Sequence, residues 1–201
     1  MVRLADPDLA ERRRRQILDA ALVCFRRRGF HQATMQEICS EAGISPGALY
    51  RYFGSKSDII AAIAEDRQSQ DLFEAELAAN ETVVDYMCAG ARRFMEKMLL
   101  DENGLLLADV FAEVARDPLL AKSLTKLDQN RVHAFANHIR DAQKRAEIDP
   151  NLDPELAADT LCAALEGIVL RYTLRRRTDV EGALAQFRAL AERYLASEAA
   201  A

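Results

Sequence analysis

Apolar residues recur every three or four positions along nearly the whole chain, which is the period of α-helices that bury one face. We find no four-residue run of alternating polar and apolar residues, rich in Val, Ile and Thr, that favours a strand. The pattern therefore predicts an all-α protein of about nine helices.

The first predicted helix begins at Asp8, which resembles a capping box together with Glu11, and ends before Gly29. Arginines occupy both ends of its polar face, at 12–15 and 26–28. The apolar face consists of Ile17, Ala20, Ala21, Cys24 and Phe25. This helix is therefore expected to bury one side and expose the other.

Two short helices follow. Thr34 and Glu37 have the spacing of a capping box, so a second helix begins there and ends at Gly43. Ser45 is the expected N-cap of a third helix, with Pro46 at its first position, where a missing N–H costs nothing. A tight turn therefore separates the two helices.

The third helix is expected to end at Phe53, and a capping box of Ser55 and Asp58 opens a fourth helix that extends to about Gln70. The last helix is expected to be capped by the Thr178 to Glu181 segment. Longer amphipathic helices are predicted over about 84–98, 105–116, 118–146, 154–172 and 180–194. The chain divides into a three-helix head, residues 1–54, and a helical bundle, residues 55–201.

Composition narrows the class of protein. Of the 201 residues, 29% are charged and 50% hydrophobic, which is the balance of an ordinary globular protein. No uncharged stretch is long enough for a membrane span, and the first residues lack the apolar region of a secretory signal. The four cysteines form no CxxC pair and have no His at metal-ligand spacing, so a zinc site is not expected. We expect a cytoplasmic protein without a cofactor or metal.

Charge is distributed unevenly along the chain. Residues 1–58 contain ten Lys and Arg against seven Asp and Glu, whereas the remainder contains 17 against 25. A basic first quarter in an acidic protein indicates a segment that contacts a polyanion.

A helix-turn-helix fits this segment, because two short helices joined by a Gly-containing turn place the second in the major groove of DNA. Helical spacing places Leu49 and Phe53 in the core of the head. Thr34 and Lys56 lie at helix N-termini, where backbone N–H groups and the helix dipole favour phosphate. The residues left outside or at the margins are Pro46, Gly47, Ala48, Tyr50, Arg51 and Tyr52.

The run from Thr34 to Asp58, above all GISPGALYRYF at 43–53 followed by GSK at 54–56, resembles the DNA-binding signature of the TetR family of bacterial transcriptional regulators. The rest of the chain is similar to the family only in length and helix order. The resemblance implies a homodimeric repressor with two DNA-binding heads and an effector cavity in the bundle, whose occupation spreads the heads and releases a DNA operator. The DNA contacts it implies are Thr34, Ser45, Pro46, Gly47, Tyr50, Tyr52 and Lys56, with Ala48 and Arg51 facing the bases.

The recognition helix departs from the commoner family pattern, since Pro46 and Ala48 stand where many members have Lys, Arg, Thr or Asn. We expect Ala48 to contact a thymine methyl group and Arg51 to supply most of the direct guanine readout. If Arg51 does not, the shape of the DNA must carry the specificity.

The bundle offers weaker candidates. Met and Phe residues of the fifth helix could line an effector cavity or pack in the core. Glu166 interrupts an apolar run, so it lies on an exposed face or needs a partner such as Arg92, Arg171 or a ligand cation. The candidate cavity residues are Met87, Phe94, Met95, Met98, Phe111, Phe135, His138, Glu166 and Tyr172. Their composition favours a small, largely apolar or amphipathic effector.

Several alternatives stay open. The arginines at 12–15 could be solvated or could contact DNA, Tyr50 and Tyr52 could pack or contact the DNA backbone, and the cysteines could be core residues or redox sensors. His133 and His138 do not share a helix face, and no hydrolase, P-loop or dinucleotide motif occurs, so we do not expect an enzyme. The classes to separate are a ligand-responsive repressor, a DNA-binding protein whose bundle recognises a protein partner or nothing, and an all-α enzyme.

A homodimer has physical support as well. The last two predicted helices are long and amphipathic, and pairing them across a two-fold axis gives a four-helix interface. A two-fold dimer in turn requires a pseudo-palindromic operator with half-sites about one turn of DNA, 34 to 36 Å, apart.

Overall fold

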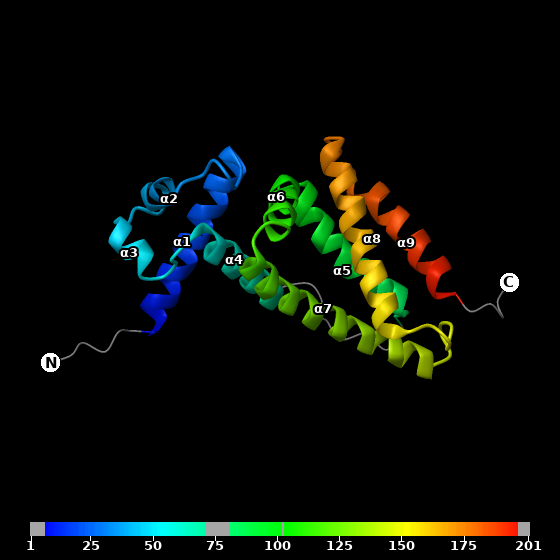
Figure 1. Cartoon of the computed structure of the whole chain (residues 1–201). Helices are drawn as coiled ribbons and strands as arrows, with labels where there is room; N and C mark the ends of the chain where they lie inside the picture. Colours follow the sequence, from blue (N-terminus) through cyan, green and yellow to red (C-terminus); the bar gives the residue numbers. More distant parts are fainter. Residues whose placement is uncertain (1–6, 71–80, 102, 197–201) are drawn as a thin grey trace. The chain divides into compact units, whose positions relative to one another are not determined.

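The computed structural model describes residues 7–70, 81–101 and 103–196, and for residues 7, 8 and 66–70 it describes the backbone alone. All elements in these ranges are helices, without a strand, so the all-α prediction is confirmed (Figure 1). They are α1 (Pro7–Arg28), α2 (Met35–Ala42), α3 (Pro46–Tyr50), α4 (Lys56–Gln70), α5 (Val83–Leu99), α6 (Gly104–Val114), α7 (Pro118–Lys144), α8 (Pro154–Leu174) and α9 (Val180–Leu195). None of the described helices combines the length and apolar character needed to cross a membrane.

Several predicted helix starts are confirmed by hydrogen bonds. Thr34 and Glu37 form a complete capping box at α2, and the Ser45 hydroxyl accepts from the Ala48 N–H at α3. The Ser55 hydroxyl accepts from the Asp58 N–H at 3.1 Å, one residue before α4. These side chains satisfy backbone N–H groups that have no partner within the helix.

Three predicted boundaries are wrong. Helix α1 already includes Pro7, so Asp8 lies inside it rather than ahead of it. Helix α3 ends at Tyr50 instead of Phe53, because the N–H groups of Tyr52 and Phe53 both donate to the Leu49 carbonyl and form a turn. The N-cap of α9 is Asp179, whose carboxylate accepts from the Gly182 N–H. A capping pattern in sequence cannot distinguish adjacent candidates when both carry a suitable oxygen.

The chain forms two compact units. The first comprises the residues up to 66 together with 108–124, and the second comprises 67–107 together with the residues from 125 onward. Helix α6 therefore contributes residues to both units. The expected functional division at residue 54 remains a prediction. It did not include residues 108–124 in the first unit.

The core of the first unit is built by α1 to α4. Helix α2 packs on α1, where the Gln16 side chain donates to the Ala42 carbonyl at 2.6 Å. The largest fully buried side chains are Ile17, Phe25, Ile38, Leu49, Ile59 and Ile60. Burying each such side chain stabilises the fold by about 1.5 to 3 kcal/mol.

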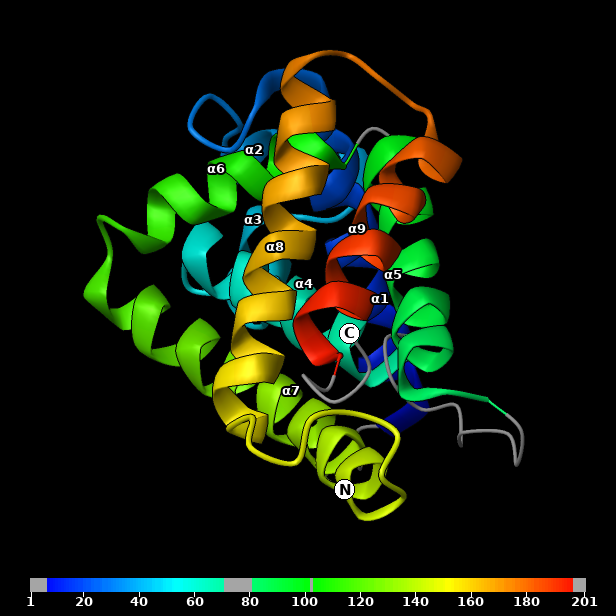
Figure 2. The ribbon, with the colours of Figure 1, turned by 90° about the vertical axis from the view of Figure 1, so that its right-hand side faces the viewer.

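In the second unit, α5 packs on α9 and α8, and α8 packs on α9, as both ribbon views show (Figures 1 and 2). Helix α7 contributes Phe135, Ala136, Ile139 and Ala142 to the same apolar cluster. The four cysteines are buried and free. Burial raises the pKa of each thiol and so keeps it protonated. A protonated, buried thiol fits a core residue better than a redox sensor.

Candidate nucleic-acid interface

The turn between α2 and α3 has the geometry that a helix-turn-helix requires. Gly43 adopts φ +62°, in the left-handed region, and its N–H bonds the carbonyls of Cys39 and Ser40. Ile44 donates to the Cys39 carbonyl at 3.0 Å, which completes the C-cap of α2. The chain can therefore begin α3 only a few residues after α2 ends.

Helix α3 has one buried and one exposed face. Leu49 is fully buried and Phe53, just after the helix, is 5% exposed, which confirms their predicted place in the core. Ala48 is half-buried. The exposed residues of the segment are Ser45, Pro46, Gly47, Tyr50, Arg51 and Tyr52. Core anchors thus hold the helix while most of its predicted DNA contacts lie on the surface.

Arg51 occupies the C-cap position of α3 between two exposed tyrosines. Tyr50 is 55% exposed and Tyr52 is 36% exposed. The Arg51 backbone N–H donates to the Leu49 carbonyl, whereas its side chain has no hydrogen-bond or ion-pair partner among the described residues. Its guanidinium is therefore available to an external acceptor, as the sequence predicted.

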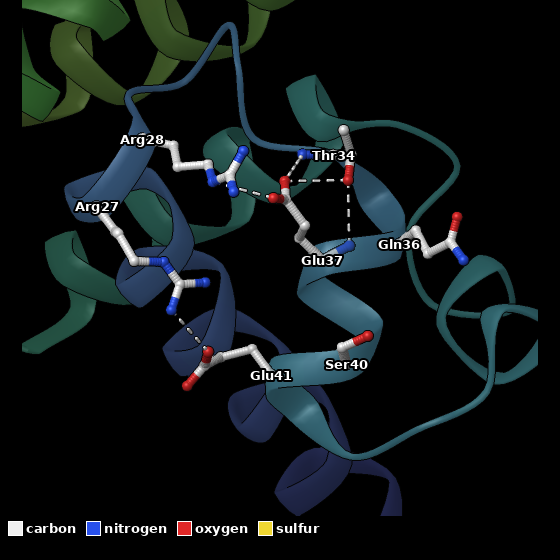
Figure 3. Close-up of a pocket in the computed structure, with 7 residues that line it drawn as sticks. All are labelled: Arg27, Arg28, Thr34, Gln36, Glu37, Ser40 and Glu41. Atoms are coloured by element: carbon white, nitrogen blue, oxygen red, sulfur yellow. Dashed lines mark hydrogen bonds and ion pairs between the residues drawn. The ribbon is translucent and has the colours of Figure 1, made fainter.

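The N-terminus of α2 is held by charged side chains (Figure 3). The Glu37 carboxylate accepts from the Thr34 N–H at 2.9 Å, and the Thr34 hydroxyl accepts from the Glu37 N–H at 3.1 Å. These hydrogen bonds with Thr34, aided by the charge of Arg28, lower the pKa of Glu37. The Thr34 side chain is exposed, but it already serves as a cap.

The arginines at the end of α1 bind carboxylates of α2. Arg28 lies 3.1 Å from Glu37 and Arg27 lies 3.5 Å from Glu41. In Figure 3 both pairs line one side of an open hollow, whereas Gln36 points away from them. Part of the positive charge of the first quarter therefore orients α2 and is already neutralised within the protein.

Lys56, a predicted phosphate contact, is bound within the first unit. Its ammonium donates to the carbonyls of Phe30 at 2.6 Å and His31 at 3.0 Å and lies 4.8 Å from the Phe30 ring centroid. Burial lowers the pKa of Lys56, and the charge of Glu113 partly opposes that effect. Lys56 thus positions the loop ahead of α2 as well as lying at the start of α4.

Two acidic residues of α6 hold the same loop, a feature that the sequence analysis missed. The Asp109 carboxylate accepts from the Phe30 N–H at 2.9 Å, and a Glu113 oxygen lies 3.5 Å from Nε2 of His31. Gly29 adopts φ +77°, and a Cβ there would lie 3.3 Å from the Asp109 carboxylate. No short-range pattern links residues about 80 positions apart, so this contact had no sequence signal.

The arginines at 12–15 have mixed surroundings. Arg14 lies 3.7 Å from Glu65 and 5.8 Å from the Phe53 ring centroid, so it braces the head. Arg13 donates to Gln16 and Arg15 lies 3.9 Å from Glu11. Local partners therefore account for part of this run, and a DNA contact by it stays a prediction.

The candidate cavity residues do not all lie in one place. Most of them belong to or pack against the apolar cluster of the second unit: Met87, Phe94, Met95, Met98, Phe135 and Tyr172. Phe111 is 40% exposed and belongs to the first unit. His138 is half-buried against the Tyr86 ring, with centroids 4.2 Å apart, and burial lowers its pKa.

Glu166 has a different partner from those expected. Its carboxylate binds Arg131 of α7 at 2.8 Å, whereas Arg92 pairs with Glu181 and Arg171 is exposed. Only 23% of the Glu166 side chain is exposed, so the expectation of an exposed face is also wrong. The side-chain partner could not be read from one helix, because it comes from another.

Comparison with known proteins identifies the family. The chain matches the family described as "Bacterial regulatory proteins, tetR family" over residues 17–63, and "Tetracyclin repressor-like, C-terminal domain" over residues 80–190. The second match covers more than half of the chain. The chain belongs to the TetR family. The resemblance noted at residues 34–58 is thereby confirmed and extended into the bundle.

Relatives of this TetR-family protein carry regulatory names. It is 31% identical to the HTH-type transcriptional regulator UidR of Escherichia coli (strain K12), over 80% of this chain and 81% of that protein. It is also 31% identical to the HTH-type transcriptional repressor AcnR of Corynebacterium jeikeium (strain K411), over 89% and 90% of the two chains. The structure of Salmonella enterica GusR matches with a TM-score of 0.77 and 28% identity, over 91% of this chain and 95% of that one. The protein is a helix-turn-helix transcriptional regulator.

Proposed function

We propose that this protein is a ligand-responsive repressor that binds a pseudo-palindromic DNA operator as a homodimer and is released by a small amphipathic effector. The observation that carries the proposal is the exposed face of α3, which is held in place by buried Leu49 and by Phe53. A short helix anchored in this way fits the major groove of DNA. The cytoplasm is the corresponding place of action, and the role is regulatory rather than enzymatic.

The exposed residues supply the two kinds of contact that operator binding needs. Tyr50 and Tyr52 bind phosphate and sugar and set the position of the head, but they carry no sequence information. Arg51 donates to a guanine, and the half-buried Ala48 contacts a thymine methyl group. Lys56 has one ammonium N–H left for a nearby phosphate, in addition to the N-terminus of α4. Both donors of Thr34 already bind Glu37, so Thr34 contributes through the N-terminus of α2, which it caps.

Dimerisation uses the outer face of α8 and α9. Leu156 and Leu174 are 61% and 68% exposed, unusual values for leucines in amphipathic helices. A stripe of exposed or half-buried positions runs along α8 at alternating steps of four and three: Leu156, Thr160, Ala163, Gly167, Leu170 and Leu174. On α9, Ala185, Ala189 and Leu190 are exposed. Small residues between leucines permit close approach of a second copy, and a symmetric interface then places two heads on the two half-sites.

Release follows from thermodynamic linkage. An effector that prefers the conformation with spread heads lowers DNA affinity by the factor by which DNA lowers effector affinity. Helix α6 is suited to transmit the change, because it contributes residues to both units and binds the loop ahead of α2 through Asp109. The apolar side chains contributed by α5, α7 and α8 supply the apolar surroundings for the effector.

Operator binding is tested with duplex DNA from upstream of the protein's own coding sequence. Anisotropy titrations at several salt concentrations should give a logarithmic affinity that falls steeply and linearly with logarithmic salt, because phosphate contacts release counterions. A scrambled duplex of equal length should bind at least about a thousandfold more weakly. Equal binding to both duplexes, or affinity that ignores salt, would contradict the proposal.

A further inference from the structure

A charged cluster bridges α7 and α8 in the second unit. Nη2 of Arg131 donates to the Glu166 carboxylate at 2.8 Å and also binds Asp128. Only 18% of the Arg131 side chain and 23% of the Glu166 side chain are exposed, against 47% for Asp128. A guanidinium and a carboxylate are therefore largely withdrawn from water within an apolar bundle.

The Arg131–Glu166 pair is not explained by the stability of the fold. Removing two charges from water costs several kcal/mol per ion, and apolar residues of similar volume often stabilise a core equally well or better. Burial opposes the charged form of Arg131, but the neighbouring Cys162, Glu166 and Asp128 outweigh it and raise the pKa of the guanidinium. Arg131 is thus a permanent, partly desolvated cation, which is a feature of functional sites.

Part of the hydrogen-bonding capacity of the Arg131 guanidinium is unused. Both of its hydrogen bonds use Nη2, and the N–H groups of Nε and Nη1 bind no acceptor among the described residues. Neither nitrogen is among the fully buried polar atoms that lack a partner in the described part of the chain. These donors are suited to a carboxylate from outside the chain.

Apolar and acidic residues both lie near this cluster, because Asp159 as well as Asp128 and Glu166 acts on Cys162. Phe135 follows Arg131 by one helical turn on α7 and is 2% exposed, and Cys162 precedes Glu166 by one turn on α8 and is 6% exposed. Burial raises the pKa of Cys162 to about 11 in spite of the nearby guanidinium. The thiol is therefore neutral at pH 7 and does not compete as an anion.

Helix α7 packs on the apolar cluster through its own apolar side chains, and two ion pairs also join it to α8. The backbones of α5, α8 and α9 approach one another closely, whereas α7 has no comparably close helix among the described elements. Arg131–Glu166 and Arg140–Glu155 bridge the distance. An effector at this place would displace side chains of α7 rather than the closer-packed α5, α8 and α9.

We propose that Arg131 is the recognition point for the effector and that the effector is an amphipathic carboxylate. The effector carboxylate binds the free donors of Arg131 while its apolar part lies among the side chains of α7 and α8. Glu166 holds Arg131 in position while the effector is absent. A cationic effector is disfavoured, because it would have to take Glu166 from Arg131 and leave a largely buried guanidinium with less compensation. This inference rests on the proposed ligand-responsive function.

The test uses pairs of probes that differ in charge but not in shape. Hexanoate to dodecanoate, benzoate and naphthoate are each compared with their primary amides, by calorimetric binding and by the thermal midpoint of the full-length protein. At least one acid should bind about tenfold to a hundredfold more tightly than its amide, because charge-assisted hydrogen bonds are lost in the amide. In Arg131→Met that ratio should fall to about one.

Three further variants keep the test falsifiable. Because Arg131→Met leaves Glu166 without its partner and can destabilise the fold, the double variant Arg131→Met with Glu166→Leu replaces both charges and should fold but lose the acid preference. Arg140→Met is the matched control, since Arg140 also joins α7 to a carboxylate of α8, and it should retain the preference. Glu166→Gln should bind the acid at least as tightly as the unmodified protein.

The inference is overturned if the amides bind as well as the acids, if no acid binds, or if the double variant binds the acid unchanged. Operator titrations on the same samples separate this failure from that of the proposed function. A protein that binds its operator but shows no acid preference loses only the inference about Arg131. A protein that binds no operator contradicts the proposed function, whatever the acids do.

Discussion

At the residue scale, the recognition helix depends on a contrast between anchored and free side chains. Leu49 is fully buried, whereas Arg51, two positions later, is exposed and its side chain has no partner among the described residues. The period of the helix places these side chains on different faces. Anchoring by Leu49 reduces the freedom of the backbone that carries Arg51, so only the side chain of Arg51 has still to be ordered on binding.

Replacing Arg51 by lysine should separate sequence readout from charge. The variant Arg51→Lys keeps the positive charge, so binding to scrambled DNA and its salt dependence should hardly change. It loses the planar pair of donors that fits guanine, and discrimination between operator and scrambled duplex should fall by about 1 to 3 kcal/mol.

Anisotropy titrations on both duplexes measure this discrimination, with Arg116→Lys, an exposed arginine just after α6, as the control. If Arg51→Lys retained full discrimination, Arg51 would not read a base. The shape of the operator would then have to supply the specificity.

At the scale of elements, α6 has a role that its own sequence does not reveal. Its pattern predicts an amphipathic helix, yet Asp109 binds the backbone of Phe30 and Glu113 lies beside His31. The loop from Gly29 to Thr34 is thereby held by residues that belong to the chain's later part. Lys56 holds the same loop from the start of α4.

Removing the Asp109 carboxylate should loosen that loop. In Asp109→Ala the Phe30 N–H loses its acceptor, and the free energy of unfolding should fall by about 1 to 3 kcal/mol. Exchange of the Phe30 amide hydrogen should become faster than in the unmodified protein.

Denaturant unfolding and hydrogen exchange measure the two effects. Asp101→Ala is the matched control, because Asp101 is exposed and has no partner among the described residues. Unchanged protection of the Phe30 amide in Asp109→Ala would show that the contact contributes nothing to the order of the loop.

At the scale of the whole molecule, the proposed dimer depends on a close approach of α8 and α9 to a second copy. Half-buried Gly167 lies within the stripe of α8, and a Cβ added there meets no atom of the chain within 4 Å. A larger side chain at this position is therefore tolerated by a single chain but not by an interface of closely packed helices.

The variant Gly167→Gln should be a monomer that folds. Sedimentation velocity should give half the mass of the unmodified protein, and operator affinity should fall more than about a hundredfold, because the two half-sites are no longer bound together. Ala134→Gln, at an exposed position of α7, should leave both quantities unchanged. A dimeric Gly167→Gln protein with normal affinity would place the interface elsewhere.

The sequence predicted most where the responsible interactions are short in range. The capping box at Thr34, the glycine C-cap at Gly43 and the burial of Leu49 all follow from residues within one or two helical turns. Boundaries were less certain, as at α3, because a tight final turn obeys the same apolar spacing as a helix.

The sequence by itself determined the helical class, the helix-turn-helix and the family, because periodicity, caps and a local motif are properties of neighbouring residues. Only the tertiary structure decided the partners of Glu166, Lys56 and Asp109, since each binds an element far away in the chain. Such pairings depend on how the helices pack, and side-chain packing in three dimensions leaves no periodic trace in one.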